Sequence, residues 1–196
     1  MSLFKKLFYF LFRYPLCKMR LGRLGKKSWL VSPMINGHRR IFIGDNVFVH
    51  YKTWLAAEPV TGDANCRLVI GDGTYVGHFC HFYASSRIEI GKDVLIADKV
   101  YLSDNGHGYQ DEHLPVIKQP VQQLPPVIIG DGAWLGENVC IIGASVGKKS
   151  VVGANSVVTK DIPDYAVAAG APAIIIKRFN TATKEWQRTD KEGNFI

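Results

Sequence analysis

Residues 70–82 read IGDGTYVGHFCHF, residues 90–102 read IGKDVLIADKVYL and residues 129–141 read IGDGAWLGENVCI. In each stretch a large apolar residue returns at every sixth position, and glycine or alanine often follows it. A repeat at a fixed step predicts a stacked, repetitive fold. The pairs that carry the repeat are Ile43-Gly44, Ile70-Gly71, Val76-Gly77, Ile90-Gly91, Ile96-Ala97, Ile129-Gly130, Leu135-Gly136, Val146-Gly147 and Val152-Gly153.

The step of six matches neither the 3.6-residue period of a helix nor the two-residue alternation of an ordinary strand. The repeating unit must therefore be a short strand followed by a turn. Three such units close a triangular coil, and coils stacked at about 4.8 Å bury their apolar residues in an internal ladder. The sequence thus predicts an all-β fold, a parallel β-helix of hexapeptide repeats.

The repeats also indicate how the chain is organised. Residues 41–179 carry them, residues 1–40 form a basic N-terminal arm or cap, and residues 180–196 form a C-terminal tail with a short helix predicted over 182–191. Within the repeats the step fails between Leu102 and Ile129, so residues 106–126 are expected to leave the coil as an extruded loop. An insertion of this size in a compact domain is usually functional.

Charge is unevenly distributed along the chain. The net charge is +7, but the first forty residues hold ten basic side chains and no acid, and the remainder has 14 Lys and Arg against 17 Asp and Glu. The body is therefore mildly acidic, at 14 − 17 = −3. This distribution argues against a nucleic-acid footprint spread over the whole fold, and no nucleic-acid partner is expected.

The N-terminal segment contains no apolar run long enough to span a membrane. Its run from Leu7 to Phe12 is far shorter than the 18 or so residues required. No secretory cleavage site follows it, and the four cysteines form no CxxC pair. We therefore expect a cytoplasmic protein. An amphipathic helix is predicted here, with Leu3, Leu7, Phe10 and either Tyr14 or Leu11 near one face.

Two roles remain open for that helix. Its apolar residues could cap the open end of the β-helix, as an exposed coil edge requires. Alternatively the helix could lie peripherally on the inner face of the membrane, where each cation near an anionic leaflet contributes about 1 kcal/mol.

Three motifs together resemble one known family. They are SDNGHG at residues 103–108, VVGANSVVTKDIP at 151–163 and AGAPA at 169–173. With the repeats, they are similar to the hexapeptide-repeat acyltransferases, in the branch of galactoside, maltose, nodulation-factor and polysaccharide O-acetyltransferases. The resemblance implies a left-handed β-helix, a homotrimer, acetyl-CoA as co-substrate, no metal and transfer of acetyl to a sugar hydroxyl. Surface polysaccharide biosynthesis, of lipopolysaccharide or capsule, is the expected setting.

His107 is the expected catalytic base, because members of this family carry a histidine where the loop leaves the coil. Removing a proton from a hydroxyl needs a base within hydrogen-bond reach, and neutral imidazole suits this task. A backbone N–H in the turns around Gly136 is expected to stabilise the developing oxyanion. The residues expected to bind the acceptor are His78, Asp104, Asn105 and His113.

The later coils are expected to bind acetyl-CoA. Relatives lay the pantetheine arm along main-chain groups of the final turns and use basic residues for the phosphates. The positions that match in this chain are Trp134, Gly136, Ala154, Thr159, Lys160, Gly170, Pro172 and Lys177, with Arg178 as a further cation.

Three alternatives stay open at this point. A small soluble acceptor such as a galactoside, maltose or a xenobiotic competes with a polysaccharide precursor. A non-enzymatic β-helix scaffold would bind no acetyl-CoA. A zinc-dependent carbonic anhydrase of the same fold would need histidines in suitable register, for which His78, His81, His107 and His113 are the candidates.

Overall fold

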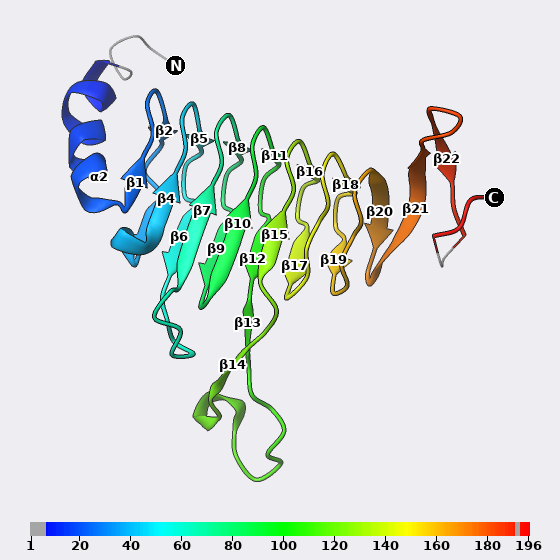
Figure 1. The fold of residues 1–196 in the computed structure, drawn as a ribbon. Helices are drawn as coiled ribbons and strands as arrows, with labels where there is room; N and C mark the ends of the chain where they lie inside the picture. The colour runs from blue at the N-terminus through cyan, green and yellow to red at the C-terminus, as the bar shows by residue number, and fades with distance from the viewer. Residues whose placement is uncertain (1–6, 191–192) are drawn as a thin grey trace.

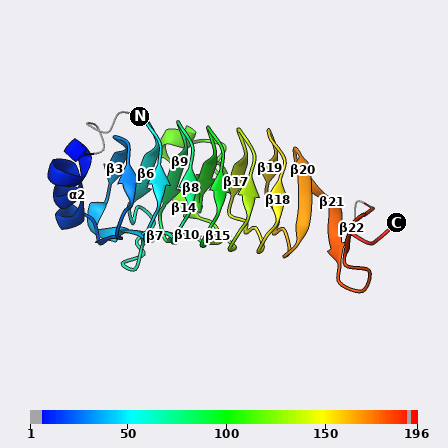
Figure 2. The same cartoon turned by 90° about the horizontal axis from the view of Figure 1, so that it is seen from above.

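The computed structural model describes residues 7–190 and 193–196, which form an elongated three-sided prism with a helix at one end and a projecting loop near its middle (Figures 1 and 2). Each side of the prism is a sheet of short strands that pair in parallel, except at the C-terminal end of one side, where the pairing is antiparallel; within the coils, successive strands along the chain belong to different sides. The predicted fold class, a parallel β-helix with an extruded loop and an N-terminal helix, is confirmed.

The three sides are called sheets A, B and C. Sheet A contains β1 (Arg23–Leu24), β4 (Ile41–Ile43), β7 (Arg67–Ile70), β10 (Arg87–Ile90) and β15 (Val127–Ile129). Sheet B contains β2 (Trp29–Leu30), β5 (Phe48–Val49), β8 (Tyr75–Val76), β11 (Leu95–Ile96), β16 (Trp134–Leu135), β18 (Val151–Val152), β20 (Ala166–Gly170), β21 (Ala173–Asn180) and β22 (Glu185–Arg188). Sheet C contains β3 (Met34–Asn36), β6 (Trp54–Ala57), β9 (His81–Ala84), β12 (Tyr101–Ser103), β17 (Cys140–Ile142) and β19 (Val157–Val158).

The core is the ladder that the six-residue step predicts. Ile70 is in register with Ile90, which is in register with Ile129, and all three are buried. Hydroxyl side chains complete the corners: the Thr74 hydroxyl donates to the Gly91 carbonyl oxygen at 2.8 Å. Such bonds satisfy backbone groups that the turns leave without a strand partner.

The coil begins earlier than the repeats at Ile41 suggested. Within the segment assigned to an arm, β1, β2 and β3 already pair in parallel with β4, β5 and β6. The first coil therefore lies in residues 23–36, ahead of the predicted start. The sequence did carry a signal, because Leu24-Gly25 and Leu30 follow the same six-residue step and are buried.

The extruded loop leaves sheet C and returns to sheet A, as the gap in the repeats predicted. Its base is an antiparallel pair of β13 (Asn105–His107) and β14 (Val121–Gln123), and η3 (Val116–Lys118) lies near its tip. The buried Gln119 side chain donates to the carbonyl oxygens of Asp111 and Leu114, at 2.9 and 2.8 Å. The loop is thus held by its own hydrogen bonds.

The C-terminal tail extends the coil by antiparallel pairing. β21 pairs with β20 and then with β22, and Trp186 of β22 contacts Phe179. The helix predicted over residues 182–191 is therefore wrong over 185–188, which form a strand. An available edge on β21 outweighs the weak helical preference of this short segment.

The N-terminal helical segment, η1 (Tyr9–Arg13) followed by α2 (Tyr14–Arg20), packs against the first coil. The packed side chains are Tyr9, Tyr14, Cys17 and Leu21. The predicted packing face is therefore confirmed at Tyr14 and wrong at Leu7, which is exposed, while Phe10 is only partly covered; Leu3 lies outside the described residues. A short stretch of π-helix in η1 rotates the face away from the 3.6-residue expectation.

Candidate active site

A groove of about 310 Å³ lies on the outer face of sheet C, where the extruded loop begins. His107 is at its edge, since it is the last residue of β13 and is in register with Val121 of β14. Its side chain is exposed. The groove is lined by Trp54, Val60, His81, Tyr83, Tyr101, Asn105, Gly106, His107 and Val121.

Three ring side chains on consecutive coils form one wall of this groove. Trp54, His81 and Tyr101 occupy equivalent positions in neighbouring strands of sheet C. The Trp54 and His81 rings are stacked, with centroids 4.2 Å apart and planes 5° apart. Tyr101 meets the other side of the imidazole edge-on, at 5.2 Å and 63°. The result is a ladder of rings along the prism, which we call the aromatic ladder.

His81 is the polar member of the aromatic ladder. Its Nε2 atom is buried and has no hydrogen-bond partner in the structure. Burial lowers the pKa of His81 below its ordinary value of 6.5, so the imidazole is neutral at pH 7. A neutral imidazole can either donate or accept a hydrogen bond through this atom, depending on its tautomer.

A tyrosine–carboxylate pair closes the groove beyond the ladder. The Tyr83 hydroxyl donates to Glu58 Oε2 at 3.0 Å, and Glu58 also receives the Asn36 side-chain amide at 3.4 Å. Burial, together with the hydrogen bond to Glu58, raises the pKa of Tyr83 to about 12. Tyr83 therefore remains protonated and acts as a fixed hydrogen-bond donor to the carboxylate.

Two adjacent acceptor-binding candidates have different surroundings. Asn105 lines the groove, and its side-chain amide donates to the Tyr83 carbonyl oxygen at 3.3 Å. Asp104 is fully buried beneath the loop base and does not line the groove. Its carboxylate instead accepts the backbone N–H groups of Ser85, Ser86 and Arg87, at 2.6, 2.8 and 2.5 Å.

The other two acceptor-binding candidates lie apart from the groove. His78 is at the corner between sheets B and C, where its Nδ1 atom is 3.2 Å from Asp98 and its ring is 4.0 Å from that of His50. Hydrogen bonds from His78 help lower the pKa of Asp98. His113 is exposed in the loop, 3.7 Å from Glu112. The structure does not bring either histidine to the residues around His107.

The histidines considered for a zinc site are correspondingly dispersed. Across residues 7–190 and 193–196, the structure brings together no group of three or more His, Cys, Asp or Glu side chains that could hold a metal ion. His81 stacks on Trp54, His78 pairs with Asp98, and His107 stands at the loop base.

A second groove, of about 280 Å³, lies further along the same edge of the prism. It is lined by Thr159, Lys160, Asp161, Ile162, Pro172, Ala173, Ile174 and Ile175. Thr159 directly follows β19, and β13 with His107 directly follows β12; these strands of sheet C are separated only by β17. Two inter-strand spacings are about 10 Å. Thus the structure brings the sequence-predicted Thr159, Lys160 and Pro172 together in one groove, on the prism edge from which the loop with His107 leaves.

The remaining residues assigned to acetyl-CoA are placed less uniformly. Trp134 is half exposed on sheet B, beside Leu95 and Val151 in the adjacent strands. The Gly136 N–H donates to the Val152 carbonyl oxygen at 2.8 Å. This N–H is therefore not free to stabilise an oxyanion, contrary to the expectation for the turns around Gly136. A Cβ at Gly136 would come within 2.6 Å of the Ala154 backbone nitrogen, which explains why this corner needs glycine.

The two cations of β21 also differ. Lys177 is exposed, whereas Arg178 is held by the C-terminal tail. The Arg178 guanidinium donates to the Gly193 carbonyl oxygen at 3.4 Å and lies 6.0 Å from the centre of the Phe195 ring. Lys160 and Lys177 are consequently better placed than Arg178 to meet a phosphate.

Sequence reasoning missed the aromatic ladder and Tyr83. The available signal was position: Trp54, His81 and Tyr101 each directly precede an apolar residue of the six-residue step, and such residues face outward. The residues of one face lie far apart in the chain, so their alignment depends on which coils become neighbours.

The chain is similar to several known proteins. The family described as "Hexapeptide repeat of succinyl-transferase" matches residues 126–160. The galactoside O-acetyltransferase of Escherichia coli strain K12 is 34% identical over 180 residues, which are 91% of this chain and 74% of that protein. The WbbJ protein of the same strain, whose name assigns it to lipopolysaccharide biosynthesis as an O-acetyl transferase, is 39% identical over 62% of this chain and 65% of its own length.

Among solved structures, a galactoside acetyltransferase in complex with coenzyme A matches with a TM-score of 0.61 and 28% identity, over 94% of this chain and 76% of that one. A hexapeptide-repeat acetyltransferase of Vibrio cholerae, complexed with acetyl coenzyme A, matches with a TM-score of 0.62 and 27% identity, over 86% and 76%. The chain spans just under two thirds of the length of WbbJ, which it matches at higher identity than the galactoside enzyme.

Proposed function

Because this chain belongs to the hexapeptide-repeat acetyltransferase family, we propose that it transfers an acetyl group from acetyl-CoA to a sugar hydroxyl, in the biosynthesis of a surface polysaccharide. The observation that carries the proposal is the position of His107, at the edge of a ring-lined groove and on the same prism edge as Thr159 and Lys160. The polysaccharide setting is supported by the similarity to WbbJ.

The aromatic ladder supports a sugar as the acceptor. Trp54 lines the groove with an indole ring, and sugar rings carry C–H groups that pack on aromatic rings. Asn105 offers a side-chain amide of the kind that orients hydroxyls. The ladder follows the prism over three coils, which suits an acceptor with more than one ring.

His107 is the proposed general base. Acetyl-CoA supplies an activated thioester, so the protein's part is to position the acceptor hydroxyl and remove its proton. The His107 side chain is exposed at the groove, where a hydroxyl can reach it. A positioned base of this kind contributes a factor of about 10² to 10⁴ in rate. No acyl-enzyme intermediate is invoked, because the acceptor oxygen attacks the thioester carbonyl directly.

The second groove fits the acetyl-CoA arm. Ile174 and Ile175 provide apolar surface, while Thr159 offers a hydroxyl and Lys160 a cation for a phosphate. Since this groove lies on the edge that leads to His107, a thioester bound along it would approach the loop base.

A homotrimer is the proposed assembly. Sheet B exposes Tyr75, Leu95 and Trp134 in one register, which makes a continuous apolar stripe along the prism. Such stripes on a soluble protein mark contact surfaces. Three copies around one axis would place each stripe against a neighbour. We propose the cytoplasm, where acetyl-CoA is available, as its location.

The test is a screen of sugar acceptors for CoA release. Free galactosides and maltose, nucleotide sugars and lipid-linked saccharides are offered to the wild type and to His107→Ala. The proposal is supported if the wild type releases CoA in the presence of saccharide precursors and His107→Ala does not. His107→Ala should still bind acetyl-CoA. Release only with small free sugars would overturn the polysaccharide assignment. Activity of His107→Ala within about threefold of wild type would remove its role as base, since loss of a general base costs far more.

A further inference from the structure

The N-terminal helical segment is fixed to the first coil by one side only. Tyr9 is 3% exposed and stacks on Trp29, with centroids 5.5 Å apart and planes 16° apart. Its hydroxyl accepts the Leu30 N–H at 3.0 Å and donates to the Ser28 carbonyl oxygen at 3.3 Å. These contacts close the end of the prism, so the capping role weighed from the sequence is real, but it uses a single face of the helix.

The opposite side of the same segment is apolar and open to solvent. Six large side chains there are between 50% and 65% exposed: Leu7, Phe8, Leu11, Phe12, Leu16 and Met19. We call them the outer face. An exposed patch of this kind marks an interaction site rather than ordinary surface. The segment stands at one end of the prism, away from the C-terminus (Figures 1 and 2).

The charge beside the outer face is exclusively positive. The sequence contains no aspartate or glutamate before Asp45, and the described part of this segment carries Arg13, Lys18 and Arg20. The surface therefore complements an anionic partner. The combination of a cationic border and a large apolar face is typical of a helix that lies in a membrane interface.

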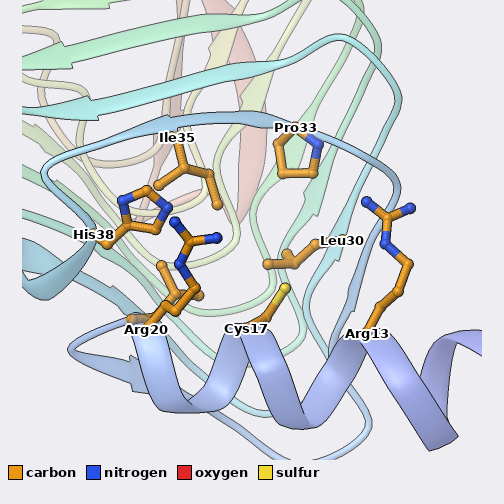
Figure 3. Close-up of a pocket in the computed structure, with 8 residues that line it drawn as sticks. Arg13, Cys17, Arg20, Leu30, Pro33, Ile35 and His38 are labelled. Atoms are coloured by element: carbon orange, nitrogen blue, oxygen red, sulfur yellow. The ribbon is translucent and has the colours of Figure 1, made fainter.

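The two arginines, Arg13 and Arg20, border a pocket of about 180 Å³ between the helix and the first coil (Figure 3). Arg13 and Arg20 lie four residues before and three residues after Cys17, so all three project from the same side of the helix. Arg13 Nη1 donates to the Ser32 hydroxyl at 2.7 Å, and His38 lies across the pocket. Both guanidinium groups can still reach an anionic group at the helix flank, because both residues are exposed.

The position of the two arginines matches the depth of lipid phosphates. Along the helix surface they lie between the packed face and Leu16 of the outer face, at about a quarter turn from each. If the outer face entered the acyl region, Arg13 and Arg20 would remain at the level of the headgroups. None of the helices in the described part of the chain has the length and hydrophobicity to cross a bilayer.

We propose that the outer face binds an anionic phospholipid membrane, with the acyl region receiving its apolar side chains and Arg13 and Arg20 receiving headgroup phosphates. The prism would then stand on the membrane by its N-terminal end, with the groove beside His107 beginning at Trp54 of the second coil. This arrangement would present the enzyme to saccharides assembled on lipid carriers. The membrane contact itself does not depend on which acceptor is used.

The test is vesicle flotation of the full chain, with purified protein and no acetyl transfer. Wild type is offered vesicles of phosphatidylcholine alone and vesicles that also contain phosphatidylglycerol. We expect flotation with the anionic vesicles and a clear decrease at high salt. The variant Leu11→Gln/Phe12→Gln/Leu16→Gln, which changes only exposed side chains, should bind at least about tenfold more weakly.

Two comparisons make the result specific. The control Tyr109→Gln/Leu114→Gln/Ile117→Gln removes the same number of exposed apolar residues from the loop and should float as the wild type does. Arg13→Gln/Arg20→Gln should lose the preference for anionic vesicles. Wild type that ignores both vesicles would overturn the proposal, as would equal binding of the Leu11 triple variant with unchanged thermal stability. A drop in oligomer mass in that variant, without loss of flotation, would assign the outer face to a second copy of the chain instead.

Discussion

The indole of Trp54 lies flat against the imidazole of His81, with ring centroids 4.2 Å apart and planes within 5°. These residues are 27 positions apart in the sequence but adjacent in sheet C, because one complete coil separates them. The stack covers one side of the imidazole, and both residues line the groove. We expect acceptor binding and stability to depend on this contact in different ways, which substitution can separate.

Replacing Trp54 with alanine should weaken acceptor binding. Loss of a stacking face costs about 1 kcal/mol, which corresponds to a rise of roughly fivefold in KM for the sugar. The KM for acetyl-CoA should stay unchanged, because Trp54 does not line the second groove. Trp186→Ala, in the C-terminal tail, is the matched control and should leave both constants unaffected. An equal rise in both KM values would indicate a general loss of structure.

The pKa of His81 predicts a dependence of stability on pH. Burial holds this pKa below 6.5, so the unfolded chain binds a proton at His81 more readily than the folded protein does. Stability should therefore be complete above about pH 6.5 and decrease as the pH falls below it. In His81→Phe the loss of Tm between pH 7.5 and pH 5.5 should be smaller. His50 and His38, whose pKa values burial also lowers, would account for the remaining dependence.

An unchanged pH dependence in His81→Phe would assign acid destabilisation to other groups. The substitution preserves a ring for Trp54 to stack on, so its Tm at pH 7.5 serves as the control for packing. That value should be at least equal to wild type, because phenylalanine removes a buried nitrogen that has no partner.

Asp104→Ala should act on folding rather than on acceptor recognition. The variant leaves three backbone N–H groups at Ser85, Ser86 and Arg87 without their carboxylate acceptor. The expected loss is about 3 kcal/mol in the free energy of unfolding, measured by urea denaturation. Asp104→Asn should recover part of it. Wild-type stability combined with a raised KM for the sugar would instead return Asp104 to the acceptor site.

Lys160 and Arg178 should differ in their effect on acetyl-CoA. Lys160→Ala removes a cation that lines the second groove, so the KM for acetyl-CoA should rise by roughly three- to tenfold, with a smaller rise at high salt. Arg178→Ala should leave this KM unchanged and lower Tm, because the guanidinium is held by Gly193 and Phe195. The opposite ranking would show that the tail releases Arg178 when acetyl-CoA binds.

The fold could be predicted because its information is local and repeated. Each unit specifies the same short strand and turn, so errors in one unit do not change the architecture. The predictions failed where the repeat is weak or absent. Leu24-Gly25 was a single pair without close neighbours, and the segment at 185–188 became a strand only because β21 offers it an edge. The helix face was correct at Tyr14 and misassigned at Leu7, because a π-helical stretch shifts the register between them.

The candidate site divides in the same way. His107 was identified from a motif that lies within a few residues, and the structure places it at a groove. Asp104, its neighbour by three positions, could not be distinguished by sequence, because only the packing of the preceding coil shows which N–H groups need its carboxylate. Likewise the sequence could not show that the Arg178 guanidinium would donate a hydrogen bond to Gly193 in the C-terminal tail.

By itself, the sequence determined the six-residue step, the apolar ladder inside the prism, the loop that leaves it and the histidine at the loop base. These follow from the spacing of residues within one or two coils, where chain geometry is nearly fixed. Only the tertiary structure decided which outward-facing side chains share a surface. Trp54, His81 and Tyr101 became one wall, and the outer face of the N-terminal helix was left open, because stacking aligns residues that the chain separates by a whole coil or more.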